Sequence, residues 1–254
     1  MDAATYLALG ASYCGPPPGP AELWGRWNFD PVLLAAMAGG LAIYLRFART
    51  GQREHLYFAA GWIVLAIAFI SPLCALTVAL FSARVGHHLL LVAVAAPLLA
   101  LGLPERLRQW ASPHSAMLLL VHTGLFWLWH VPDAYSVALG DTPVYWLMQT
   151  TLLVSATLFW VGMLSKSTRA AAAIGGLVAS SMQMGLLGAL LTFAPSPLYA
   201  PHLATTDAFG LSALADQQLA GLMMWVPGAL PYLVGALVVL MRVLDTTTLG
   251  EERR

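Results

Sequence analysis

The side chains of this sequence that could do chemistry are mainly histidines and methionines, together with one carboxylate. Imidazole, thioether and thiol groups are the ligands that cuprous copper favours, whereas an all-oxygen set would indicate calcium or magnesium. We take eight residues as candidate metal ligands: His87, His88, His122, His130, His202, Asp216, Met223 and Met224. If the fold brings these side chains together, the site that they form favours copper.

The composition indicates what kind of fold must position these residues. The chain has 254 residues, of which 59% are hydrophobic and only 9% are charged, and its mean hydropathy is +0.74. Soluble domains carry about 25% charged residues, which argues against a soluble enzyme, a nucleic-acid-binding protein or a disordered chain. The sequence has no Gly-rich phosphate loop, no His-Glu-x-x-His motif and no Gly-x-Ser-x-Gly elbow. We therefore expect a membrane protein that is not an enzyme and binds no nucleic acid.

Seven apolar runs are long enough to cross about 30 Å of hydrocarbon, which takes about 20 helical residues. We expect an all-α polytopic membrane protein with seven transmembrane helices near residues 31–49, 56–80, 85–103, 114–132, 143–164, 170–194 and 216–241. Residues 1–30 would form an N-terminal tail, residues 31–241 the transmembrane domain and residues 242–254 a C-terminal tail. The single lysine, Lys166, lies in a predicted loop, which excludes a retinal Schiff base.

The basic residues indicate the orientation of these helices. Ten of the twelve fall on one side of the predicted topology, and only Arg26 and Arg84 fall on the other. Because cytoplasmic loops carry an excess of Lys and Arg, we expect the N-terminus outside and the C-terminus in the cytoplasm. The ten residues are Arg46, Arg49, Arg53, Arg106, Arg108, Lys166, Arg169, Arg242, Arg253 and Arg254.

This orientation places most of the candidate ligands toward the outer side. His87 and His88 open the third span, His130 closes the fourth, and His202 lies in the loop before the seventh. His122 lies about 15 Å deep, near mid-membrane, where an imidazole needs a partner. The histidines are therefore expected at two depths, an outer group and a single buried one.

The seventh span combines a carboxylate with two thioethers. At 100° per residue, Asp216 and Met223 share one helix face two turns apart, as do Gln217 and Met224. An outer carboxylate would thus lie above a buried thioether. Pro227, inside this span, frees the carbonyl of Met223, which predicts a kink or offers a ligand oxygen.

Each candidate also has a purely structural interpretation. The methionines could be packing residues, and the two adjacent histidines point 100° apart, so at most one of them readily faces a given site. His122 could form a hydrogen bond between helices, and His130 could belong to an interfacial aromatic belt. His202 could be solvated in its loop, and Asp216 could cap its own helix and face water.

The two cysteines could pair in an oxidising compartment, but Cys14 lies in the predicted tail and Cys74 in an apolar run. We expect two free thiols. The first 25 residues have neither a basic segment nor a sustained apolar core, so they resemble no cleavable signal peptide.

Several motifs resemble, in the same order along the chain, those of the seven-span CtaG-type cytochrome c oxidase assembly factors. They are Ser71–Leu73, Leu80–Ala83, His88–Leu91, Ala96–Gly102, Phe126–Pro132, Leu198–His202, Asp216–Gly221 and Met224–Gly228. The resemblance implies a protein of the bacterial cytoplasmic (inner) membrane that helps copper reach the buried copper centre of haem-copper cytochrome c oxidase. It implies as partners the oxidase subunit being assembled, a periplasmic copper donor and the lipid bilayer. The single-span, cupredoxin-like factor of the same name is a different protein.

The chain departs from the family pattern at the start of the third span. The family pattern there is His-Met-x-x-His, whereas Arg84 and Val85 occupy the first two positions of this chain. Two histidines at i and i+4 would share one helix face. Only His88 of that pair is present, and the additional His87 is expected to point elsewhere.

The residues and the resemblance together suggest a route for copper. A periplasmic donor would deliver cuprous copper near His88, His130 and Asp216. The ion would then pass to one of three buried ligands on its way to the oxidase: Met223, Met224 or His122.

Three other functions would use the same residues. A membrane haem protein could take His88 as one axial ligand, with His122 or His130 as the other. A copper permease would continue the path to the far side through His55, His114 and Met163. A metal-free scaffold would clamp the oxidase subunit through small residues that let helices approach closely: Gly175, Gly176, Gly185 and Gly188.

Overall fold

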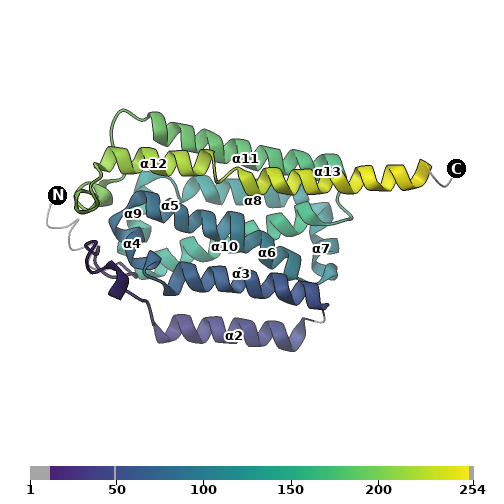
Figure 1. Ribbon diagram of the computed structural model, residues 1–254, viewed down its shortest axis with the longest axis horizontal. Helices are drawn as coiled ribbons and strands as arrows, with labels where there is room; N and C mark the ends of the chain where they lie inside the picture. Colours follow the sequence, from purple (N-terminus) through teal and green to yellow (C-terminus); the bar gives the residue numbers. More distant parts are fainter. Residues whose placement is uncertain (1–11, 49, 252–254) are drawn as a thin grey trace.

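The computed structural model describes residues 12–48 and 50–251, with side chains described as far as residue 245. All regular structure in these residues is helical, and the long helices run roughly along one common axis (Figure 1). These are α2 (Pro31–Phe47), α3 (Gln52–Ile70), α8 (Ser115–Leu128), α10 (Thr142–Leu164), α11 (Ala170–Phe193), α12 (Ala213–Trp225) and α13 (Leu230–Glu251). Another runs without interruption through α5 (Phe81–Leu89), η2 (Leu90–Ala95) and α6 (Ala96–Gly102). The short helices are η1 (Leu23–Gly25), α4 (Leu73–Ala79), α7 (Glu105–Ala111), η3 (Ser112–His114), α9 (Pro132–Gly140), η4 (Ala200–His202) and η5 (Asp207–Phe209).

Five helical segments are long and apolar enough to cross a membrane: Gln52–Ile70, Phe81–Gly102, Thr142–Leu164, Ala170–Phe193 and Ala213–Asp245. A sixth exists if Glu105–Leu128 and Pro132–Gly140, which meet at 76°, count as one bent span. The apolar helix α2 is shorter, with 17 residues. An all-helical membrane protein is therefore confirmed, with five to six candidate spans.

Prolines interrupt the regular helices at two places in the first half of the chain. The span predicted at 56–80 ends before Pro72, which has no N–H to continue α3, and α4 begins directly after it. Pro97 is the second residue of α6, and the turn before it is widened to the π-helix η2, where the Ala96 N–H donates to the Leu91 carbonyl. This wider turn lets α5 continue into α6 past the proline.

A third proline breaks the span predicted at 216–241. Helix α12 ends at Trp225, and α13 begins three residues after Pro227, so the predicted kink is present. The carbonyl of Met223 accepts a hydrogen bond from the Gly228 N–H at 2.9 Å. The interpretation of this carbonyl as a free ligand oxygen is therefore wrong, because the backbone after the proline turns back to satisfy it.

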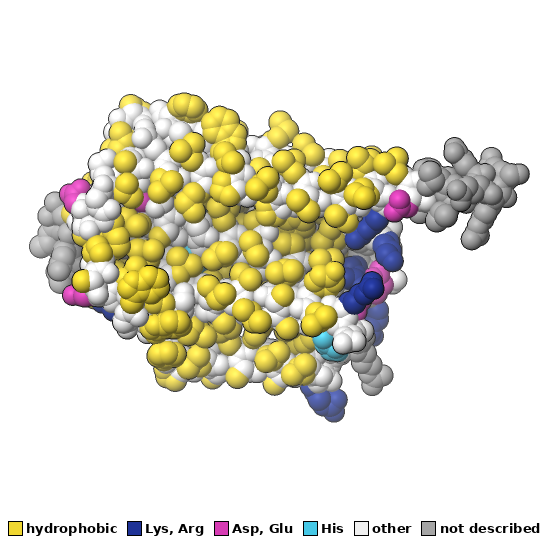
Figure 2. Space-filling model, viewed as in Figure 1, with side chains coloured by type: hydrophobic (Ala, Val, Ile, Leu, Met, Phe, Trp, Pro, Cys, Tyr) yellow, Lys and Arg dark blue, Asp and Glu magenta, His cyan; other side chains and the backbone are white. Residues whose placement is uncertain are grey.

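The helix that runs from α5 to α6 lies at the centre of the bundle. Its first half packs against α12, and its second half packs against α3 and α10. Helix α11 packs against α8, α12 and α13, while α2 lies at the edge beside α3, where Gly40 approaches the Trp62 ring (Figure 1). Hydrophobic side chains cover the face that runs along the helices (Figure 2), as expected for a surface in contact with lipid.

Lys and Arg side chains gather at the end of the molecule where α13 projects (Figure 2). Arg46 lies near the end of α2, Arg53 near the start of α3, Lys166 just after α10, and Arg242 in α13. Arg84 lies apart from them, inside α5. Parts of the predictions fall outside the described residues: residues 1–11 of the predicted N-terminal tail, Arg49, and residues 252–254 of the predicted C-terminal tail, which include Arg253 and Arg254.

The segment before α2 packs against the end of the bundle opposite the Lys and Arg side chains. A disulfide joins Cys14 to Cys74, with their Cα atoms 5.5 Å apart, so the expectation of two free thiols is wrong. The Asn28 side chain donates to the Phe69 carbonyl at 3.1 Å, and the Tyr13 hydroxyl donates to the Asp30 carboxylate at 2.8 Å. These contacts bring Cys14 to the start of α4, which sequence position alone does not reveal.

Loss of this disulfide is expected to destabilise the protein. The bridge closes a loop of 60 residues, and a crosslink of that length contributes about 2–4 kcal/mol to the free energy of unfolding. We expect Cys14→Ser to lower the melting temperature of the purified protein by about 5–10 °C. A reductant should lower the wild-type melting temperature equally and leave that of Cys14→Ser unchanged. Full labelling of both cysteines by a maleimide without a reductant would contradict the disulfide.

Candidate functional site

Helix α5 positions the centre of the site, and its start is fixed by a residue from a distant part of the chain. Asp216, at 0% exposure, accepts the Phe81 N–H at 2.6 Å, the Ser82 N–H at 3.2 Å and the Ser82 hydroxyl. A carboxylate at a helix N-terminus satisfies free N–H groups and complements the helix dipole. Asp216 therefore does cap a helix, but it caps α5 rather than its own helix, and it is buried rather than solvated.

His88, on α5, lies beside His130, which follows α8. The ring centroids are 5.8 Å apart and the ring planes meet at 80°. His130 Nδ1 lies 2.7 Å from the Phe126 carbonyl oxygen, which can only accept, so Nδ1 carries the proton and Nε2 keeps its lone pair. Neither ring nitrogen of His88 has a hydrogen-bond partner in the described part of the chain, although the side chain is only 2% exposed. Two buried imidazoles with uncommitted nitrogens therefore lie in contact.

His87 belongs to the same helix but faces a different neighbour. Its ring packs edge-on against Phe69, with the centroids 5.0 Å apart, and lies 6.0 Å from the His88 ring. The side chain is fully buried, and both of its nitrogens lack a hydrogen-bond partner among the residues described. The predicted divergence of the two adjacent histidines is thus present, with His88 toward His130 and His87 toward α3.

Arg84 is a fully buried cation one turn before these histidines. Its guanidinium lies 5.3 Å from the centre of the Tyr145 ring and close to the Tyr135 hydroxyl. Its three nitrogens form no hydrogen bond in the part of the chain that the structure describes. Gln149, beside Tyr145, is likewise buried with both amide atoms unpaired. We refer to Arg84, His87, His88, His130 and Gln149 as the α5 polar cluster.

This cluster concentrates unsatisfied polar groups. Within the described residues, nine of the fourteen buried side-chain nitrogen and oxygen atoms without a hydrogen-bond partner belong to it. Buried polar groups are normally paired, and an unpaired group indicates a water, an ion or a functional role. The sequence signal for Arg84 was a charged residue at the edge of an apolar run, which we used for the orientation and as a departure from the family pattern. No comparable signal in the sequence marks Tyr135, Tyr145 or Gln149.

The two methionines of α12 lie on different sides of that helix. The Met223 methyl group packs against α5, about 3.1 Å from where a Cβ would stand on Gly86. Met224 is buried toward α11, where its Cβ approaches Gly188. Asp216 and Met223 therefore both face α5, as their spacing predicted. Met223 packs on the face of α5 that carries Gly86, about 200° around the helix from His88, whereas Met224 serves the packing of α12 on α11.

His202 is buried in the loop before α12, so the expectation of a solvated side chain is wrong. Its Nε2 lies 2.7 Å from the Tyr135 hydroxyl and its Nδ1 lies 3.4 Å from the Ala79 carbonyl oxygen. Burial lowers the pKa of His202 to about 3, so the ring is neutral at physiological pH. The neighbouring Tyr199 hydroxyl donates to the His130 carbonyl at 2.8 Å. His202 thus helps to hold the loop against the cluster, and both of its nitrogens are already engaged.

His122 lies apart from the cluster, two turns before His130 on α8. It bonds across to α10, with Nδ1 3.1 Å from the Ser155 hydroxyl, which is the hydrogen bond between helices considered above. The Phe126 ring stands between the two histidines, with centroids 6.3 Å from His122 and 4.6 Å from His130. An ion passing between them must therefore move around this ring.

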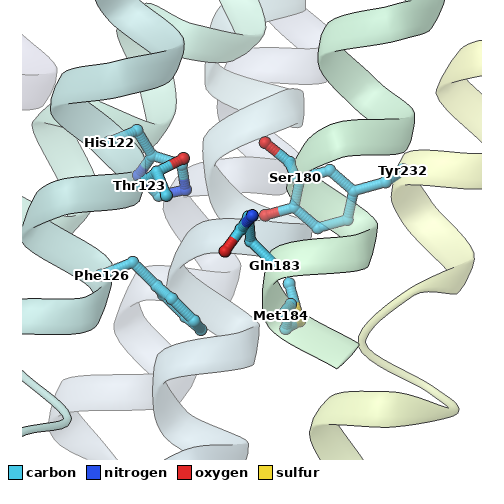
Figure 3. Close-up of a pocket in the computed structure, with 7 residues that line it drawn as sticks. All are labelled: His122, Thr123, Phe126, Ser180, Gln183, Met184 and Tyr232. Carbon is cyan, nitrogen blue, oxygen red and sulfur yellow. The ribbon is translucent and has the colours of Figure 1, made fainter. Parts of the chain in front are cut away.

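His122 also borders a small cavity between α8, α11 and α13 (Figure 3). The cavity has a volume of about 10 Å³, enough for about one water molecule. The hydroxyls of Ser180 and Tyr232 line it without a hydrogen-bond partner among the described residues. A water molecule in this cavity could form hydrogen bonds with both hydroxyls. Together with His122, these hydroxyls make the cavity a small polar site inside an apolar bundle.

Residues that a permease would need on the far side are not gathered by the fold. His114 Nδ1 lies 2.8 Å from the Trp110 carbonyl oxygen, His55 packs edge-on against Tyr44, and Met163 packs against Gly176. In the described ranges, no group of three or more His, Cys, Asp or Glu side chains is arranged to hold a metal ion. The ligand set that the structure brings together at the cluster is therefore the two imidazoles of His88 and His130.

Comparison with known proteins supplies an independent result. Residues 41–246 match the family model described as cytochrome c oxidase caa3 assembly factor (Caa3_CtaG). No match is found among curated proteins or among solved structures. The matched region contains the entire α5 polar cluster, Met223 and Cys74, but begins after Cys14.

Proposed function

Because the chain belongs to the cytochrome c oxidase caa3 assembly factor family, we propose that it carries cuprous copper to the oxidase subunit being assembled. Membership of this family implies association with cytochrome c oxidase. Copper is then a cargo that enters and leaves, and the protein breaks no covalent bond. The direction, from the periplasmic side inward, is part of the proposal.

The contact between His88 and His130 is the observation that carries this proposal. Both rings are buried, and each has a nitrogen free to act as a ligand. Binding through Nε2, with Nδ1–H donating to a backbone carbonyl, is the usual arrangement of a ligating histidine, and His130 has it. Imidazole is a ligand type that copper accepts, and the Met223 thioether packs on the opposite face of the same helix, at Gly86.

Arg84 makes this position selective for an ion of low charge. The guanidinium lies near enough to His87 and His88 to act on charges placed there. Its repulsion doubles when a dication replaces a monocation at the same distance. The arrangement therefore supports Cu(I) over Zn(II) or Cu(II), and it weakens retention in a way that suits a cargo that must be released.

For the topology we propose seven spans with the N-terminus in the periplasm. The apolar helix α2, which is 17 residues long, would be the seventh span beside the five long segments and the bent pair. Two independent features support the orientation. The disulfide at one end of the bundle fits an oxidising compartment, and the Lys and Arg side chains at the other end fit the cytoplasm. The corresponding location is the bacterial cytoplasmic membrane.

A metal-free scaffold is the second candidate function. A groove of about 540 Å³ on the outer face of α11 is lined by Ser181, Gly185 and Ala189, which recur every fourth residue. Small residues at this spacing let another helix approach closely. Gly176 and Gly188, by contrast, are occupied by contacts with Met163 and α12 inside the bundle.

The copper content of the purified protein tests the proposal. We expect about one cuprous ion per chain after anaerobic loading and removal of free metal. Alanine at either His88 or His130 should lower the affinity, measured by competition with a chromogenic chelator, at least tenfold. His114→Ala, at the opposite end, serves as the control and should bind normally. If the wild-type protein binds no copper, the copper proposal is contradicted and the metal-free scaffold becomes the favoured function. A Soret band in the absorption spectrum would indicate bound haem instead.

A further inference from the structure

A lateral groove follows α13 along the side of the bundle. It has a volume of about 470 Å³ and lies between α13 and the helix formed by η2 and α6. Its walls are almost entirely apolar and include Pro97, Leu98, Val234 and Val238, and Arg242 closes one end. A groove with this lining, on the face that contacts lipid, has the chemistry of an acyl-chain site.

A second groove, of about 460 Å³, adjoins the first at Arg242 and carries several polar side chains on a mostly apolar wall. Ser165, Lys166 and Thr168 line it from the loop after α10, and Asp245 is its acidic residue. The lining therefore contains two cationic side chains, Lys166 and Arg242, and one carboxylate, Asp245, which gives it a net positive charge. Arg242 donates to the Leu164 carbonyl at 3.3 Å, which places the guanidinium at the junction and uses one of its five donors.

The order of these features along α13 matches the order within a phospholipid. The apolar groove extends toward the membrane interior, and the basic groove lies at the end of the bundle where Lys and Arg gather (Figure 2). Basic pockets between helices at a cytoplasmic surface bind anionic headgroups. We propose that the two grooves together bind one anionic phospholipid, with an acyl chain along Val234 and Val238 and the phosphate between Arg242 and Lys166.

The bound lipid would join α13 to the end of α10. Arg242 belongs to α13, whereas Lys166 follows α10, so a phosphate held by both links two helices that are distant in sequence. Binding therefore stabilises the folded protein by an amount that grows with the logarithm of the lipid concentration above Kd. The inference concerns the end of the bundle opposite the α5 polar cluster and does not depend on copper.

Lipid titration of the full-length protein in detergent tests the inference. We expect phosphatidylglycerol to raise the melting temperature at lower concentrations than phosphatidylcholine with the same acyl chains. Neutralising both cations in Lys166→Gln/Arg242→Gln should raise the half-saturating concentration of phosphatidylglycerol about fivefold for each charge. The control Arg46→Gln/Arg106→Gln removes two basic side chains outside both grooves. It should change the half-saturating concentration of phosphatidylglycerol less than twofold.

Two further arms separate the acyl-chain site from the phosphate site. Val234→Trp, which narrows the apolar groove without changing charge, should also weaken phosphatidylglycerol binding. Lys166→Gln alone serves if the double variant does not fold. An equal response to both lipids, an equal loss in the control variant, or full stabilisation by inorganic phosphate without a lipid would each overturn the inference.

Discussion

Replacing His88 by alanine is expected to lower cytochrome c oxidase activity in cells at least tenfold, while the amount of inserted protein stays unchanged. The His88 nitrogens form no hydrogen bond in the described part of the structure, so their loss leaves no buried partner unpaired. The substitution removes one of the two imidazoles that lie in contact, and with it one ligand of the proposed copper site.

The controls for this experiment separate copper handling from folding. His114→Ala, at the opposite end of the bundle, should retain full oxidase activity and equal abundance. Excess copper in the growth medium should restore part of the activity of His88→Ala, since copper can then reach the oxidase without the pair. Wild-type oxidase activity in both His88→Ala and His130→Ala cells would contradict the copper route while leaving family membership intact.

Asp216→Ala is expected to behave differently, by destabilising the protein itself. The substitution leaves the N–H groups of Phe81 and Ser82 unpaired inside the bundle and removes the negative charge nearest to the start of α5. Each buried N–H group left without a partner costs about 1–3 kcal/mol, and we expect the amount of folded protein to fall strongly.

The melting temperature of purified variants measures this effect. Asp216→Ala should melt at least 10 °C below the wild type. Asp216→Asn keeps one acceptor oxygen, so its melting temperature should lie between those of Asp216→Ala and the wild type. Asp207→Ala, which removes an exposed carboxylate from the same loop region, is the matched control and should melt as the wild type does. A normal melting temperature with lost oxidase activity in Asp216→Ala would assign this carboxylate to copper instead.

The long helices were predictable because each is a run of about 20 apolar residues, and the break at Pro227 follows from its missing N–H. The short helices α4, α7 and α9 were not predicted. Each has only seven to nine residues, too few to show a periodic pattern of hydrophobic residues that distinguishes it from the neighbouring apolar run. The predicted span at 56–80 merged α3 with α4 for that reason. Seven spans remain a prediction, since α2 is shorter than the other segments.

The candidate site was predictable in its residue types but not in its contacts. The spacing of Asp216 and Met223 on α12 placed both on one face, which is what the structure has. The contact of His88 with His130 depends on the rotation of two helices from different spans, and no spacing along the chain encodes it. The disulfide was missed because Cys14 lies 60 residues from Cys74, and the hydrogen bonds of Asn28 bring them together only in the folded state.

The capping of α5 by Asp216 has a consequence for the synthesis of the protein. A ribosome completes α5 more than a hundred residues before it reaches the residue that caps that helix. Until then the first N–H groups of α5 have no carboxylate, and the helix that carries His88 begins without its anchor. The final structure of α5 therefore depends on completion of α12, and a chain truncated before Asp216 would insert its first spans with α5 uncapped.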